Sequence, residues 1–120
     1  MSLTIFLNQV TNNKPVSFDE TIAMINDHYH YQPTDFKNGL TEPVLYNKAG
    51  TNEGSCRIFA FAQWHGLNEE QTLNLFGDFY RQDVLADPNG SSHPNIRNFL
   101  RDGWKGIIFD GVVLTPKSLV

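Results

Sequence analysis

Apolar residues recur at helical spacing near the N-terminus and predict two helices. The first runs from Leu3 to Val10, and Ser2 stands where it can cap the first turn. The second begins at Ser17, because Ser17 and Glu20 form a capping-box pair that satisfies two backbone donors. Its apolar stripe consists of Phe18, Ile22, Ile25 and Tyr29.

The stretch from Tyr31 to Thr51 has a different pattern. It contains several glycines and prolines and the tight-turn pair Asn38-Gly39. It also contains aromatic residues, which are expected to pack against the rest of the domain. This indicates that the stretch is ordered. We therefore expect irregular structure with short strands around Asp35–Lys37 and Val44–Tyr46.

Three further helices follow in the second half of the chain. Ser55 can cap a helix from Cys56 to about His65, which Gly66 would close in the left-handed conformation. Asn68 is expected to cap a longer helix that carries Leu73, Phe76, Phe79 and Tyr80. Pro94 suits the first position of another helix, which Gly103 stops.

The C-terminal pattern predicts a β-hairpin. Two apolar runs, 107–109 and 112–114, flank the turn pair Asp110-Gly111. An isolated hairpin is marginal in water, so this one should also pair with another strand or lie on the helices. The expected fold is a single α+β domain over residues 1–120, with about five helices and a small antiparallel sheet.

Composition fits a folded domain and excludes several classes. The 120 residues include nine Phe, four Tyr and two Trp, which is too much aromatic surface for a disordered chain. The net charge of −4 argues against a general binder of nucleic acid or anionic membranes. No apolar run approaches the length of a membrane span, and the N-terminal residues do not resemble a secretory signal peptide.

Cys56 is the first candidate for chemistry, because it is the single cysteine and precedes an apolar helix. In the first turn of a helix, the positive end of the helix dipole should lower the pKa of its thiol. A histidine within reach would then make a Cys-His nucleophile, and His93 is one candidate. The alternative is a small buried cysteine that only packs the helix.

Two histidines raise the question of a metal. His28 and His30 form an H-x-H pair at a helix end, which is a weak metal-ligating pattern compared with H-E-x-x-H. We expect ordinary capping and surface placement for both, with no metal site and no cofactor.

Two polar, glycine-containing loops run into helix N-termini. They are Asn52–Cys56 and Asn89–Asn95, and each presents backbone N–H groups at the positive end of a helix dipole. If the loops meet in space, they would form a site for a small anion such as a phosphate or a carboxylate. The candidate binding residues are Asn52, Glu53, Ser55, Ser92, His93 and Arg97. Simple turn geometry is the alternative explanation for both loops.

Four stretches together resemble the HopJ type III effector family. They lie within the segments His28–Gly39, Asn52–Phe59, Phe76–Leu85 and His93–Ile107, which span nearly the whole chain. The resemblance carries no catalytic residues with it. It implies a small protein of Gram-negative bacteria, in a family named for members injected into plant cells.

The resemblance leads to one hypothesis about function, and the candidate residues lead to an alternative. The first is a non-enzymatic, virulence-associated interaction domain with an unidentified protein partner. It would act in the bacterial cytoplasm or, after type III secretion, in a host cell. The alternative is a cytoplasmic bacterial protein with a small-anion site or a Cys/His hydrolase site around Cys56 and His93.

Overall fold

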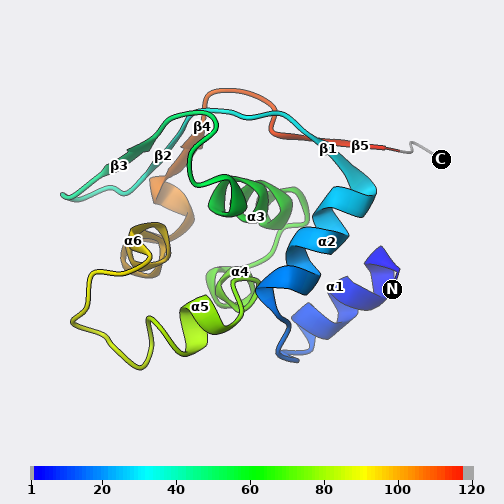
Figure 1. Ribbon diagram of the computed structural model, residues 1–120, viewed down its shortest axis with the longest axis horizontal. Helices are drawn as coiled ribbons and strands as arrows, with labels where there is room; N and C mark the ends of the chain where they lie inside the picture. Colours follow the sequence, from blue (N-terminus) through cyan, green and yellow to red (C-terminus); the bar gives the residue numbers. More distant parts are fainter. Residues whose placement is uncertain (1, 118–120) are drawn as a thin grey trace.

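The computed structural model describes residues 2–117, and they form an α+β fold (Figure 1). Its α-helices are α1 (Leu3–Thr11), α2 (Phe18–His28), α3 (Glu53–Trp64), α4 (Glu69–Asn74), α5 (Asp78–Arg81) and α6 (Pro94–Asp102), followed by the 3-10 helix η1 (Gly103–Gly106). Its strands are β1 (Tyr29–Tyr31), β2 (Phe36–Asn38), β3 (Leu45–Asn47), β4 (Ile107–Phe109) and β5 (Leu114–Pro116). The predicted fold class is confirmed.

The C-terminal segment 107–116 lies antiparallel to segment 29–38. Strand β5 pairs with β1, which places Tyr29 opposite Pro116, and β4 pairs with β2, which places Phe36 opposite Phe109. Both pairs fall on one antiparallel register, so the two ladders are parts of one interrupted ribbon. Strand β3 extends the β2–β4 part to three strands.

Of the two strands expected on either side of Asp110-Gly111, the first lies at 107–109 as expected, and the second begins two residues later than expected, at Leu114. Each pairs with an N-terminal strand. Strands β4 and β5 belong to different sheets, and both run antiparallel to segment 29–38. Between the ladders, Asp110 N donates to Asp35 O at 3.0 Å and Gln32 N donates to Val113 O at 2.8 Å. The sequence did not predict which strands β4 and β5 would pair with, because turn residues specify only the local structure of the chain.

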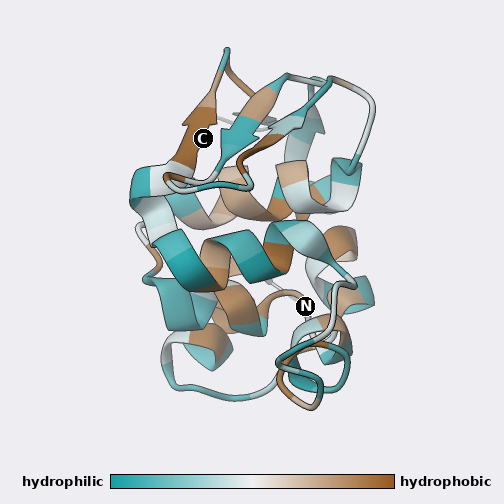
Figure 2. Ribbon diagram, turned by 90° about the vertical axis from the view of Figure 1, so that its left-hand side faces the viewer, coloured by the Kyte–Doolittle hydropathy of each residue, from teal (hydrophilic) through white to brown (hydrophobic). Residues whose placement is uncertain are grey.

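Helix α3 forms the centre of the core, directly beneath the strands in Figure 1. Its residues Ile58, Phe59, Phe61 and Ala62 are completely buried. The ring centroid of Phe59 lies between 4.9 and 6.4 Å from those of Phe36, Phe76, Phe99 and Trp104. The surrounding helices carry hydrophilic and hydrophobic residues in alternation (Figure 2), as expected for helices with one face on a core.

The local capping signals of the sequence are confirmed. Ser2 accepts a hydrogen bond from Ile5 N, and Ser17 and Glu20 form the expected reciprocal capping box. Asn68 forms a second capping box with Gln71. These signals are reliable because both partners lie within one turn of chain.

Two expected helix boundaries are wrong. Helix α3 begins at Glu53 with Asn52 as its N-cap, so Ser55 lies inside the first turn and is not the cap. The longer helix expected after Asn68 is broken at Gly77, where φ is 62° and ψ is −134°, and becomes α4 and α5. The break lets the backbone at Gly77 pack against the start of α2: a Cβ on Gly77 would lie 2.6 Å from Phe18 N.

The packing at Gly77 leads to a testable prediction. Gly77→Ala should destabilise the fold by about 1–3 kcal/mol more than Gly66→Ala, because the added methyl group overlaps backbone. Gly66 is the matched control, since its φ of 64° also favours glycine but a Cβ there meets no atom within 4 Å. Urea unfolding of both variants measures the difference, and equal losses would contradict the close approach.

Candidate functional site

The two polar loops singled out in the sequence meet in space. Asn52 and Ser55 at the start of α3 line the same cleft as His93 and Asn95 at the start of α6, and the cleft has a volume of about 280 Å³. Its lining includes both polar residues and the aromatic rings of Phe18, Phe76 and Phe79. The structure therefore brings together three of the predicted binding residues, Asn52, Ser55 and His93.

Helices α3 and α6 differ from α1, α2 and α4 in that no side chain caps their N-termini. Their N-cap residues, Asn52 and His93, have positive φ values of 51° and 50°. The first intrahelical bonds are donated by Cys56 to Asn52 O and by Arg97 to His93 O. The N–H groups that precede them are left for another acceptor, and the cleft lies beside both helix ends.

His93 is fixed in the wall of the cleft by two contacts. Its Nε2 lies 2.9 Å from Asp83 Oδ2. Its ring packs on Phe79, with 4.9 Å between centroids and planes tilted by 35°. A carboxylate that holds one imidazole nitrogen sets the orientation of the ring. Asp83 was not predictable from the sequence, because irregular chain separates it from His93 and no local spacing places the two together.

A network of buried asparagines positions both loops. Asn95 Nδ2 donates to Asn47 Oδ1 at 2.9 Å, and Asn47 Nδ2 donates back to Asn95 Oδ1 at 3.1 Å. Asn52 Nδ2 donates to the same Asn47 oxygen at 2.7 Å. Asn38 Nδ2 donates to Asn95 O and Oδ1. Strands β2 and β3 therefore hold the N-termini of α3 and α6 at a fixed separation.

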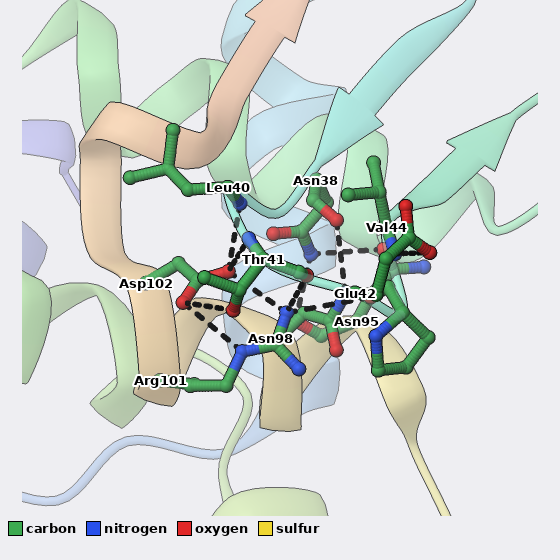
Figure 3. A network of polar contacts seen from close by, with 10 residues as sticks. Asn38, Leu40, Thr41, Glu42, Val44, Asn95, Asn98, Arg101 and Asp102 are labelled. Atoms are coloured by element: carbon green, nitrogen blue, oxygen red, sulfur yellow. Dashed lines mark hydrogen bonds and ion pairs between the residues drawn. The ribbon is translucent and has the colours of Figure 1, made fainter.

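At its other end, α6 holds the loop between β2 and β3 (Figure 3). Asp102 accepts hydrogen bonds from Leu40 N at 2.7 Å and from Thr41 N at 3.3 Å. Arg101 donates to Asp102 and to Thr41 O. The hydrogen bond from Arg101, helped by the two backbone donors, holds the pKa of Asp102 well below its usual range.

Cys56 is placed away from this cleft. Its side chain is 1% exposed, and its Sγ lies 3.7 Å from Thr34 O. Burial raises the pKa of the thiol, which is the opposite of the expected effect of the helix dipole. His93 lines the cleft and Cys56 does not, so the structure does not bring the two members of the suggested Cys-His pair into one cavity.

The remaining predicted binding residues also lie outside the cleft lining. Glu53 Oε1 accepts a hydrogen bond from Tyr31 OH at 3.3 Å. The guanidinium of Arg97 donates to Asp87 O at 2.9 Å and to Ser92 Oγ at 3.2 Å, so it closes the loop that precedes α6. Arg97 therefore has a structural role, because its N–H groups are hydrogen-bonded to atoms of this loop.

The weak metal candidates do not gather further ligands. Within residues 2–117, no group of three or more His, Cys, Asp or Glu side chains could hold a metal ion. His28 is half-buried at the end of α2, and His30 is exposed on β1. No helix in this part of the chain is long and apolar enough to cross a bilayer.

The burial of Cys56 predicts a slow thiol. At neutral pH, Cys56 should react with iodoacetamide roughly tenfold or more slowly than a free cysteine, because its thiolate is both scarce and inaccessible. The matched control is the double variant Ser55→Cys, Cys56→Ala, which moves the thiol to position 55 in the cleft lining. There it should react much faster. Mass spectrometry follows the alkylation. A Cys56 that reacts as fast as free cysteine would contradict its placement.

Comparisons with known proteins fit the resemblance seen in the sequence. The family model "HopJ type III effector protein" matches residues 3–114. The solved crystal structure of VPA0580, described only as a protein of unknown function, is 44% identical with a TM-score of 0.91, over 98% of this chain and 95% of that one. A comparison with curated proteins gives no match. The chain belongs to the HopJ type III effector protein family.

Proposed function

We propose that this protein is a type III effector that acts as a small protein-interaction domain. The observation that carries the proposal is the family match over residues 3–114. In this proposal the protein is made in the cytoplasm of a Gram-negative bacterium, enters a host cell through a type III secretion system, and contributes to virulence by binding a host protein. The fold supports such a role, because a rigid core supports several exposed apolar side chains, among them Tyr46, Trp64 and Val112 at 75%, 53% and 71% exposure.

Delivery is the step that tests this proposal. The chain is fused to a calmodulin-dependent adenylate cyclase reporter and expressed in a bacterium with a functional type III system. We expect cyclic AMP to rise in contacted host cells, and to stay at background when the same fusion is expressed in a strain whose secretion ATPase is deleted. Background levels in both strains, with the fusion present in the bacteria, would contradict the effector function.

A second function is favoured by one specific observation, the convergence of the two uncapped helix N-termini on one cleft. We propose that this cleft binds a small anion, such as a phosphate or carboxylate group. The unpaired N–H groups at the starts of α3 and α6 would donate to it, with Ser55 and His93 at its sides. Glu53, whose charge would repel an anion, is engaged with Tyr31 OH.

Amide chemical shifts test the anion site. Titration with inorganic phosphate should move the backbone N–H signals of Gly54, Ser55 and Ile96, because these groups would donate to the anion. The first turns of α2 and α4 are an internal control, since Ser17 and Asn68 already cap them. Equal responses at all four helix starts, or no response at α3 and α6, would contradict a specific site.

A further inference from the structure

The aromatic residues in the cleft lining are not explained by an anion alone. Phe18 and Phe79 line it together with His93, and Asn52 and Ser55 add polar groups to the same lining. A phosphate or carboxylate group binds through hydrogen-bond donors, and aromatic rings beside it do not stabilise its binding. The composition of the wall therefore indicates a ligand with two chemically different parts.

The rings are arranged as a supported platform. Phe79 is 39% exposed, so part of its ring is open to solvent. Phe18 packs against it edge-to-face, with 4.9 Å between centroids. The ring of His93 also packs on it, with 4.9 Å between centroids, and is itself held by Asp83. Both neighbours restrain the ring of Phe79. The protein therefore loses little side-chain entropy when a flat ligand packs against this ring.

The size of the cleft limits the ligand. Its volume of about 280 Å³ is at the lower end of the range for small-molecule sites, which is roughly 300–1,000 Å³. The cleft can take one ring and one attached polar group. Asn95, a buried residue of the lining, is held by hydrogen bonds with Asn47 and Asn38, so this part of the wall is fixed.

We propose that the cleft binds a small molecule in which an aromatic or heteroaromatic ring carries an anionic group. The ring lies against Phe79 and His93, and the anionic group lies toward Ser55 and the start of α3. This inference rests on the second proposed function for the position of the anion, and it adds the ring and the residues that recognise it.

Two probes that differ only in the ring test the proposal. Phenyl phosphate and methyl phosphate are titrated into the full chain, and their dissociation constants are compared by NMR. We expect phenyl phosphate to bind roughly three- to tenfold tighter, as is usual for one aromatic contact. In Phe79→Leu this advantage should fall to near one while methyl phosphate binds as before. The control variant is Tyr46→Leu, which removes an exposed aromatic ring outside the cleft lining.

The outcomes separate the two proposals. Equal affinities of the two probes would overturn the ring site and leave the anion site intact. Binding of phenyl phosphate without any binding of methyl phosphate would support the ring and contradict the anion site, and binding of neither would overturn both. If Phe79→Leu fails to fold, contacts between the ligand ring and the rings of Phe79 and His93, seen as intermolecular NOEs in the unmodified protein, decide the question, and their absence overturns the ring site.

Discussion

The position of α6 depends on hydrogen bonds between buried side-chain amides. Asn95 and Asn98 are each about 5% exposed, on a helix that also buries Ile96 and Phe99 in the apolar core. A buried amide without a partner costs about 1–3 kcal/mol, so α6 is stable only where β2 and β3 present matching donors and acceptors. Apolar packing alone tolerates small shifts of a helix, whereas this amide pairing selects one register.

The same network determines whether a cleft exists. Asn47 accepts hydrogen bonds from both Asn95 and Asn52, so a single side chain on β3 joins the starts of α6 and α3. Toward its C-terminus, α6 is tied down by Asn98 and Asp102, which bind the loop between β2 and β3. Because α6 is held near both of its ends, the network keeps the loop that carries His93 beside the start of α3.

Local features of the chain were predictable, and long-range ones were not. The capping boxes at Ser17 and Asn68 lie within one turn, and the strands at β2 and β3 were found to within one residue, because their signals are local. The break at Gly77 depends on Phe18, far away in sequence. The convergence of the two loops could not be predicted, because the asparagines that enforce it resemble ordinary turn residues in sequence.

Helical geometry explains why the cleft and the cysteine are separate. Successive residues of an α-helix point about 100° apart around its axis, so the side chains of Ser55 and Cys56 leave the helix in different directions. Ser55 lines the cleft, while the thiol of Cys56 points to Thr34 in the segment between β1 and β2. Because α3 begins at Glu53 and not at Cys56, the residue that lies beside the cleft is the hydroxyl and not the thiol. The polar side chains in the cleft lining are therefore the hydroxyl, amide and imidazole groups of the two loops, and the thiol is not among them.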